Sequence, residues 1–365
     1  MWSLDKMKIT TILGTRPEII RLSRIMPLLD KSCEHTIIHT TQNHDYKLND
    51  IFFQELGLRL PDMFLGAKEM SLGDQLATMF PKLENTFLRN RPDKVVILGD
   101  TNSGLASFIA ERMGISVYHL EAGNRCHDKR VPEEVNRKLI DAISSYNLPY
   151  TPGSRENLIR EGVRKDKIFT SGNPINEVLK HYGRGIGSST IMATLGIRHG
   201  NYFLATFHRA ETVDHPHRLK QIIDGLNGVA NKYKMPVVCS VHPRTKAKLA
   251  SGKYDVSALK MLEPFGFFDF VKLERGAKCI LTDSGTVSEE ACILGIPCVI
   301  MRDTTERPEI IESGSAIVST VDSARILACT KIIMHTDAWP LPIGYGDLNV
   351  ATKIINFVIG GEPTQ

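Results

Sequence analysis

Short apolar runs alternate with longer helical patterns along the whole of this 365-residue chain. Several runs, such as 95–98 and 237–239, are apolar at consecutive positions, which is typical of parallel strands covered on both faces. The repeated β-α-β order predicts an α/β fold with doubly wound parallel sheets. Strands are expected at 9–13, 36–39, 94–98, 116–120, 168–171, 202–206, 237–241, 279–282, 298–301 and 316–319. Helices are expected at 18–29, 72–89, 103–113, 134–144, 218–232, 267–274, 287–294 and 350–359.

The length of the chain favours two domains. The turn at 172–174 and the Gly- and Ser-rich stretch at 182–189 indicate a boundary near Pro174. We therefore expect one doubly wound domain over residues 1–174 and a second over residues 175–347. A C-terminal helix within residues 348–365 is expected to pack back on the first domain.

Charge and cysteine content exclude several classes of protein. A formal net charge of +4 is too small to argue for a nucleic-acid partner. No apolar run approaches the roughly 18 residues of a membrane span, and residues 1–6 do not read as a secretory signal. The seven cysteines are scattered without a C-x-x-C pair, which favours reduced thiols in the cytoplasm and argues against a zinc site.

Two glycine-containing turns each follow an expected strand and precede an expected helix. They are residues 14–18 (GTRPE) and 282–286 (TDSGT). A helix start at the carboxyl end of a strand favours anions through its backbone N–H groups, and Arg16 adds a forked donor for phosphate. Glu290, one turn into the second helix, is placed to accept from ribose hydroxyls. Together the turns predict a nucleotide in a cleft between the domains, with ordinary capped helix starts as the alternative.

Acidic residues occupy three further positions of this kind. Asp100 and Glu121 each lie at the end of an expected strand, and Glu133 follows Pro132 directly before an expected helix. Carboxylates at the carboxyl ends of adjacent parallel strands converge on one crevice, where clustered acids raise one another's pKa values toward the range useful for proton transfer. The alternatives are that Asp100 caps the next helix and that Glu133 stabilises a helix dipole.

His208 and Arg209 follow the expected strand at 202–206. A histidine titrates near neutral pH, so His208 suits donation to a leaving phosphate or the shuttling of a proton. A histidine without a chemical role at a strand end is the alternative, which the sequence leaves open.

In their order and spacing over residues 9–358, these motifs resemble the non-hydrolysing UDP-N-acetylglucosamine 2-epimerase family. The resemblance rests on residues 14–18, 99–101, 121–123, 132–134, 136–137, 208–209, 241–243, 282–285 and 302–309. It implies two Rossmann-like domains of the GT-B type, usually as a homodimer, and a UDP-sugar substrate.

The resemblance also implies roles for individual residues. UDP is expected to contact Arg16, Ser284, Gly285, Thr286 and Glu290. The reacting centre falls on Asp100, Glu121, Glu133 and His208. Supporting positions are Arg21, where the family has lysine, and Arg137, Arg209, Gln42, His242 and Arg307.

A narrower likeness concerns the substrate. Residues 121–134 and 18–23 resemble the branch that forms UDP-N-acetyl-L-fucosamine from its 2-acetamido-2,6-dideoxy-L-talose epimer. The common branch usually has Leu-Arg where this chain has Asn124-Arg125.

The chain also departs from the family pattern. Thr41 replaces a glycine that is usual before Gln42, and Ala210 stands where a charged residue is usual. Gln42 and His242 match positions that form an effector pocket in some bacterial relatives. Because Thr41 replaces the usual glycine beside Gln42, the sequence does not decide whether this chain has such an effector pocket.

The implied reaction inverts C2 of a UDP-N-acetylhexosamine. The C2–H bond is not acidic, because the acetamido group is attached through nitrogen. We therefore expect anti elimination of UDP to a 2-acetamidoglycal, followed by re-addition, with donors that hold the departing diphosphate and no metal or redox cofactor. The alternatives are a GT-B glycosyltransferase, a hydrolysing epimerase that releases UDP and free N-acetylmannosamine, and a nucleotide-sugar sensor.

Overall fold

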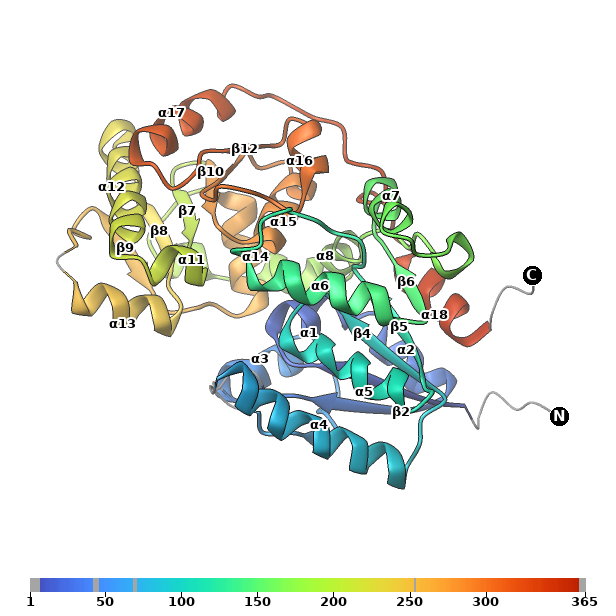
Figure 1. Cartoon of the computed structure of the whole chain (residues 1–365). Coiled ribbons are helices and arrows are strands. Elements are labelled where there is room, and N and C mark those ends of the chain that lie inside the picture. The colour runs from blue at the N-terminus through green and yellow to red at the C-terminus, as the bar shows by residue number, and fades with distance from the viewer. Residues whose placement is uncertain (1–6, 42–45, 68–70, 253, 361–365) are drawn as a thin grey trace. The chain divides into compact units, whose positions relative to one another are not determined.

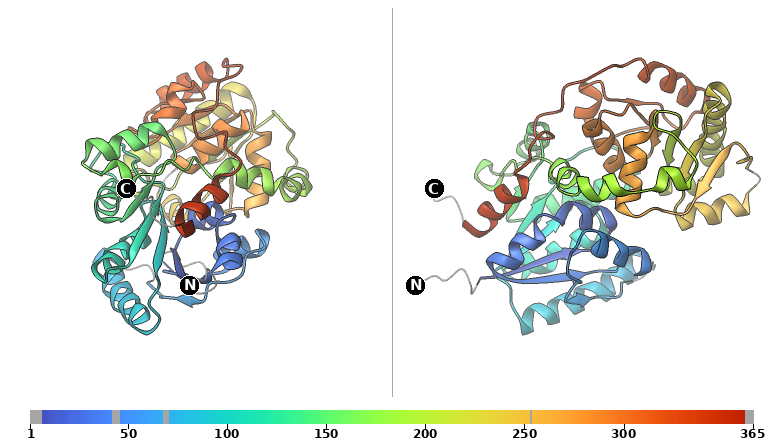
Figure 2. Two further views of the ribbon diagram at one scale, coloured as in Figure 1. Left: turned by 90° about the vertical axis from the view of Figure 1, so that its right-hand side faces the viewer. Right: turned by 180° about the vertical axis from the view of Figure 1, so that it is seen from behind.

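The structure is a computed structural model that describes residues 7–41, 46–67, 71–252 and 254–360. The chain divides into two compact units, and each is described by itself (Figure 1 and Figure 2). Unit 1 comprises Met1–His181 with Ile343–Gln365, and unit 2 comprises Tyr182–Pro342. The division follows α8 (Ile175–His181), whereas the sequence suggested a boundary after Pro174.

Unit 1 is built around a six-stranded parallel sheet in the order β3-β2-β1-β4-β5-β6. The strand order reverses between β1 and β4, and in such sheets ligands bind at this switch point, outside the carboxyl ends of the strands. The strands are β1 (Lys8–Leu13), β2 (Glu34–His39), β3 (Met63–Phe64), β4 (Lys94–Leu98), β5 (Ser116–Leu120) and β6 (Tyr146–Leu148). The helices are α1 (Arg16–Leu22), α2 (Met26–Ser32), α3 (Tyr46–Glu55), α4 (Leu72–Arg89), α5 (Ala106–Arg112), α6 (Pro132–Ile143), α7 (Pro152–Arg160), α8 and α18 (Val350–Gly360), with 3₁₀ turns at Asn102–Leu105 and Lys165–Lys167.

The C-terminal helix α18 packs on unit 1. The Lys94 ammonium donates to the Val358 carbonyl at 2.5 Å, and the Phe357 ring stacks on Phe169 at a centroid distance of 4.4 Å. The buried Ile354 lies on the same helix. No helix among the described residues combines the length and apolarity that crossing a bilayer requires.

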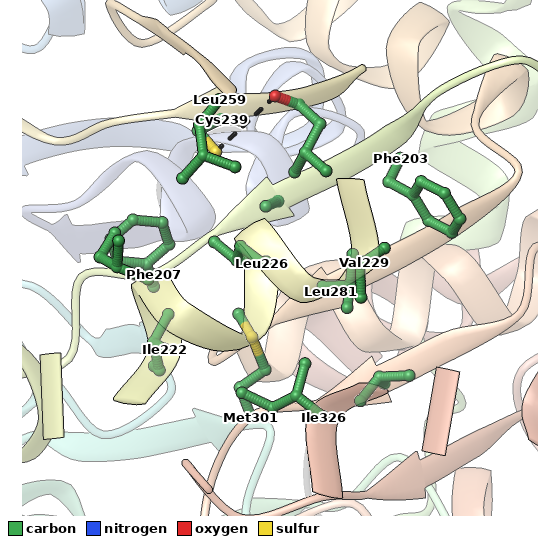
Figure 3. Close-up of a cluster of buried hydrophobic side chains, with 14 of the residues drawn as sticks. Phe203, Phe207, Ile222, Leu226, Val229, Cys239, Leu259, Leu281, Met301 and Ile326 are labelled. Atoms are coloured by element: carbon green, nitrogen blue, oxygen red, sulfur yellow. Dashed lines mark hydrogen bonds between the residues drawn. The ribbon is translucent and has the colours of Figure 1, made fainter. Parts of the chain in front are cut away.

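Unit 2 repeats the topology with a sheet in the order β12-β11-β10-β7-β8-β9, so its switch point lies between β7 and β10. Its core packs α12 and α17 on the sheet through residues such as Phe203, Leu226, Leu281 and Ile326 (Figure 3). The strands are β7 (Phe203–Thr206), β8 (Val237–Ser240), β9 (Leu259–Leu262), β10 (Cys279–Thr282), β11 (Cys298–Ile300) and β12 (Ala316–Val318). The helices are α9 (Gly183–Ser188), α10 (Ile191–Thr194), α11 (Ala210–Val213), α12 (Pro216–Tyr233), α13 (Pro243–Ser251), α14 (Phe267–Gly276), α15 (Gly285–Leu294), α16 (Pro308–Glu312) and α17 (Ser323–Ile333).

The expected fold class, two doubly wound Rossmann-like domains of the GT-B type, is confirmed. The expected strand at 168–171 is wrong, because only a single bridge joins Ile168 to Asn147. The expected helix at 18–29 is also wrong. It divides into α1 and α2, because Pro27 lacks an N–H and fits only the first turn of a new helix. The expected cleft between the domains stays a prediction.

Candidate functional site

The candidate residues lie where strands near the two switch points end. In unit 1 they follow β1, β4 and β5, and in unit 2 they follow β7, β8 and β10 (Figure 1). Each unit thus gathers motifs that lie far apart in its sequence. The functional roles of these side chains stay predictions.

Glu18 fastens the turn between β1 and α1. Its buried carboxylate accepts hydrogen bonds from the backbone N–H groups of Gly14 (2.5 Å) and Thr15 (2.9 Å) and from the Thr101 hydroxyl (2.5 Å). Burial raises the pKa of Glu18 to about 7, although these hydrogen bonds oppose the shift. Sequence reasoning missed this role, whose signal is a glutamate three residues after the threonine of a capping box.

Two arginines of α1 are held in different ways. Arg16, in the first turn, is half-buried, and its guanidinium carbon lies 5.9 Å from the centroid of the Phe52 ring. Arg21, in the last turn, is fully buried and donates to the Glu121 carboxylate. The Arg21 guanidinium also lies over the Tyr150 ring, 5.7 Å from its centroid. Arg21 is thus fixed on two sides, as the planar guanidinium allows.

Glu121 follows β5 in the left-handed region of backbone space, with φ of +67°. For a residue other than glycine this conformation costs about 1–3 kcal/mol and persists only where the surroundings hold it. The backbone N–H of Glu121 donates to the Leu148 carbonyl at 3.1 Å, and its side chain is only 9% exposed. Strain of this kind marks Glu121 as a candidate functional residue.

Asp100 lies beside Glu121, because the two residues follow the paired strands β4 and β5. The Asp100 carboxylate accepts a hydrogen bond from Nε of Arg137 at 3.0 Å and a second hydrogen bond from Nη2 of the same guanidinium. Asn136 donates to the Asp100 carbonyl at 3.0 Å. The alternative that Asp100 caps the next helix is not supported, because the Thr101 hydroxyl accepts from the backbone of the following turn.

The two glutamates at the start of α6 differ in their surroundings. Glu133 is half-buried, while Glu134 is buried. Glu134 accepts from the backbone N–H groups of Cys126 (3.0 Å) and His127 (3.1 Å) and from Arg137 (2.9 Å). Glu134 therefore holds the loop after Glu121 against α6, a role that sequence reasoning did not assign.

In unit 2 a buried aspartate organises the predicted histidine site. Asp283, directly after β10, accepts from the backbone N–H groups of His208 (2.8 Å) and Arg209 (2.9 Å). Nδ1 of His208 lies 3.4 Å from the same carboxylate, and the His208 side chain is 46% exposed. The His242 ring, which follows β8, lies 6.4 Å from the His208 ring. Three strand ends thus supply the histidines and their aspartate.

The predicted diphosphate turn begins α15. Ser284 is the N-cap residue, and a Cβ on Gly285 would lie 2.4 Å from a carboxylate oxygen of Glu306, so a larger residue would displace that side chain or the turn. Glu290 is buried within α15. Burial and the nearby Glu290 raise the pKa of Glu274, at the end of α14, well above its usual value. Thr286 is half-buried in the first turn of α15.

Arginines surround the first turns of α15. Nε of Arg307 donates to Glu289 at 2.5 Å, and both side chains are buried. Arg209 lies 3.6 Å from Glu306, which also accepts from Arg302 at 2.7 Å. Arg307 and Arg209 therefore lie in a network of ion pairs that holds the start of α15.

The predicted effector positions are Gln42, which follows Thr41, and His242. Gln42 lies outside the described residues. Thr41 adopts φ of +64°, a conformation that favours glycine, so the chain keeps the backbone shape of a glycine position with a β-branched residue.

Among the described residues, no cluster of three or more histidine, cysteine or acidic side chains is arranged to hold a metal ion.

Comparison with known proteins yields one family. A family model described as UDP-N-acetylglucosamine 2-epimerase matches residues 29–359. A UDP-N-acetylglucosamine 2-epimerase of Methanocaldococcus jannaschii is 40% identical over 351 residues, which cover 93% of this chain and 96% of that protein. A UDP-2,3-diacetamido-2,3-dideoxy-D-glucuronate 2-epimerase of Pseudomonas aeruginosa is 33% identical over 86% of this chain and 88% of that protein.

Solved structures agree. The crystal structure of Methanocaldococcus jannaschii UDP-GlcNAc 2-epimerase in complex with UDP-GlcNAc and UDP matches with a TM-score of 0.93 and 38% identity. The match covers 97% of this chain and 100% of that one. The chain therefore belongs to the UDP-N-acetylglucosamine 2-epimerase family and is an isomerase of that type.

Proposed function

We propose that the protein inverts C2 of a UDP-N-acetylhexosamine without net hydrolysis of the sugar–UDP bond. The observation that carries the proposal is the placement of Asp100 and Glu121 at neighbouring strand ends, each fixed by its own buried arginine. The similarity to a structure solved with UDP-GlcNAc and UDP supports a UDP-sugar as substrate. The glycosyltransferase and hydrolase alternatives are not favoured by these relatives.

The acids of unit 1 are assigned to the proton transfers. As the C1–O bond to UDP breaks, a carboxylate takes the C2 proton, the C1–C2 double bond of a 2-acetamidoglycal forms, and UDP keeps the bonding electrons. Return of a proton to the opposite face of C2 and re-addition of UDP at C1 complete the inversion. We assign Glu121 and Asp100 to these transfers and Glu133 to supporting them.

The turn residues of both units are assigned to UDP. Arg16 offers a half-buried guanidinium, and the start of α15 at Gly285 offers backbone N–H groups, to a diphosphate. Ser284, Thr286 and Glu290 belong to the same helix start. The exposed ring of His208 suits donation to the departing phosphate.

The sugar itself is a choice between two classes: UDP-GlcNAc with its manno epimer, and the 6-deoxy-L-talose and L-fucosamine pair. Of the residues that mark the second class, Asn124 and Cys126 are buried. Asn124 accepts from the Ser154 hydroxyl at 2.9 Å, and the Cys126 backbone is bound by Glu134. These residues act on specificity through the shape of the loop after Glu121, and both sugar classes belong in one assay.

The decisive experiment incubates the protein with each candidate UDP-sugar in D2O. NMR follows deuterium entry at C2 and the epimer ratio, while a coupled assay follows free UDP. Deuteration with an epimer equilibrium and no net UDP loss is the expected result. Stoichiometric UDP release would instead identify a hydrolysing enzyme, and absence of C2 exchange with every sugar would contradict the proposal.

We also propose that the protein is a homodimer in the cytoplasm. Helix α5 lies between α4 and α6 (Figure 1). These three helices carry exposed apolar side chains, among them Leu72, Phe108, Val135 and Leu139, which we assign to the contact with a second copy. All seven cysteines are free thiols, which suits a reducing compartment. Light scattering of the purified protein and of a Val135→Glu variant tests the assembly, since the variant is expected to be monomeric.

A further inference from the structure

One buried carboxylate of unit 1 is surrounded by groups of β5 and of the loop that follows Glu121. Asp141, in the last turns of α6, accepts a hydrogen bond from the backbone N–H of Gly123 at 3.1 Å. Its oxygens also lie 2.8 Å from Nδ1 of His119 and 2.7 Å from Nη2 of Arg125. All these side chains are at most 2% exposed.

These contacts bracket Glu121 in the sequence. His119 precedes it within β5, while Gly123 and Arg125 follow it. The bracketed backbone is the one in which Glu121 adopts its strained left-handed conformation. A carboxylate that binds residues on both sides of a strained position supplies the surroundings that such strain requires.

The same contacts reach the loop of Asp100. Nε2 of His119 lies 2.8 Å from the carbonyl oxygen of Gly99, the residue before Asp100. Both ring nitrogens of His119 thus face acceptor oxygens, a carbonyl on one side and a carboxylate on the other. The ring of His119 therefore bridges the Asp141 carboxylate and the backbone of the loop that carries Asp100.

We propose that Asp141 is a positioning residue for the epimerisation, and that its contact with His119 fixes the placement of Asp100 relative to Glu121. This inference rests on the proposed function, because it assigns both acids to the proton transfers at C2. The spacing along α6 supports it. Glu134, Arg137 and Asp141 lie three and four residues apart on one buried face, where Glu134 binds the loop after Glu121 and Arg137 binds Asp100.

Charge balance fits this role. Burial opposes ionisation, but hydrogen bonding to His119 and the charge of Arg125 hold the pKa of Asp141 below its usual value. Arg125 also pairs with Glu161 on its far side, with Nε 2.9 Å from Oε1. The buried Arg125 guanidinium therefore lies between the buried carboxylate of Asp141 and the more exposed carboxylate of Glu161, so the buried charge of Asp141 is paired.

Three substitutions test the proposal. Asp141→Asn keeps the shape but replaces one acceptor oxygen with a donor. His119→Asn keeps a polar group near the position of Nδ1 and loses the contact toward Gly99, whereas His119→Gln keeps a polar group near the position of Nε2 and loses the contact toward Asp141. Glu111→Gln is the matched control. Its carboxylate accepts from Val117 (3.0 Å) and Ser145 (2.7 Å) at the opposite end of β5.

The measurements are kcat for C2 exchange, the Kd of UDP with its binding stoichiometry, and the ratio of UDP released to sugar epimerised. Asp141→Asn is expected to lower kcat about 10–100-fold, because small displacements of reacting groups have effects of this size. UDP should bind with unchanged stoichiometry and a Kd within about twofold. Released UDP per epimerisation should rise, since a misaligned acid returns the proton more slowly. Each His119 variant is expected to lower kcat by about tenfold, and Glu111→Gln should match the wild type.

The outcomes distinguish a failure of the inference about Asp141 from a failure of the proposed function. If the wild type exchanges C2 hydrogen while all three variants keep its kcat and its release ratio, Asp141 positions nothing and the inference is wrong. The same conclusion follows if kcat falls only in proportion to the binding stoichiometry, because that pattern reports lost folded protein. A wild type that exchanges no C2 hydrogen contradicts the proposed function instead. Should Asp141→Asn fail to fold, the two His119 variants decide the question by the same criteria.

Discussion

The carboxyl edges of the two sheets share a strand order but hold their polar side chains in different ways. In unit 1, Asp100 and Glu121 each meet a buried guanidinium, from Arg137 and Arg21. In unit 2, the carboxylate of Asp283 binds backbone N–H groups, and the His208 ring beside it remains 46% exposed. Proton transfer benefits from groups fixed in advance, whereas recognition of a diphosphate uses backbone donors and side chains that a ligand can complete. The contrast fits the proposed assignment of the C2 proton transfers to unit 1 and of most diphosphate contacts to unit 2, with Arg16 as the proposed contact from unit 1.

The largest effect should come from the acid in the strained position. Glu121→Gln keeps the shape but removes the base and the partner of Arg21, so kcat for C2 exchange is expected to fall about 10³-fold. UDP affinity should stay within about twofold of wild type, because Glu121 is assigned to the sugar and not to UDP. Steady-state kinetics and calorimetric titration with UDP measure the two quantities. Turnover that survives the substitution would mean that Glu121 is not the base.

The second effect concerns Glu18, a buried carboxylate of unit 1 that accepts hydrogen bonds from two backbone N–H groups. The pKa of Glu18 is raised to about 7 in the folded protein from 4.5, so the native state binds this proton more tightly than the unfolded chain does. The contribution of Glu18 to stability is therefore full below about pH 4.5 and is lost as the pH rises to about 7. The loss amounts to about 3 kcal/mol.

The measurement compares the free energy of unfolding of wild type and Glu18→Gln by urea denaturation between pH 4.5 and 8. The wild type should lose stability relative to the variant as the pH rises through this window, because glutamine cannot ionise. Glu34→Gln, at the exposed start of β2, supplies the reference curve for removing a carboxylate from the surface. A difference curve for Glu18→Gln that is flat with pH would show that burial does not control this group.

The sequence sufficed for the architecture of both units and for the strand ends that carry the candidate residues. Consecutive apolar positions, as in β4 and β10, reveal buried parallel strands whatever their neighbours are. The sequence does not predict the shortest strands. Met63 and Phe64 of β3 are exposed and only two residues long, so they carry no pattern. Pro27 predicts a break in the helix, whereas the apolar pattern around it predicts a continuous helix; the proline determines the outcome.

The partners of the candidate residues were not predictable in the same way. Arg21 and Glu121 lie 100 positions apart, and no local pattern states that they meet. Asp141 carries no motif and looks like a helix residue near a C-terminus. Its position becomes informative only when α6 is folded against β5 and the loop after it. Such long-range pairs depend on the packing of whole elements, whereas strand-end motifs depend on local sequence.

A smaller effect tests whether the fixed geometry of unit 1 depends on the guanidinium itself. Arg21→Lys keeps the charge but loses the planar fork and its stacking over Tyr150, so kcat is expected to fall about tenfold with little change in UDP affinity. Lysine is usual here in the family, which is why the loss should be moderate. Arg24→Lys is the control, since Arg24 contacts His181 at 3.2 Å away from the acids. Equal kcat in both variants would show that charge alone fixes Glu121.

The smallest effect belongs to unit 2 and should fall on binding alone. Gly285→Ala places a Cβ 2.4 Å from Glu306, so the start of α15 or the Glu306 side chain must shift. The Kd of UDP is expected to rise about fivefold while kcat at saturating substrate stays within about twofold, a loss of about 1 kcal/mol. Gly228→Ala in α12 is the matched control, because its Cβ would meet Leu327 only at an ordinary 3.8 Å. If Gly285→Ala lowered kcat and left the Kd of UDP unchanged, the assignment of the start of α15 to UDP binding would be wrong.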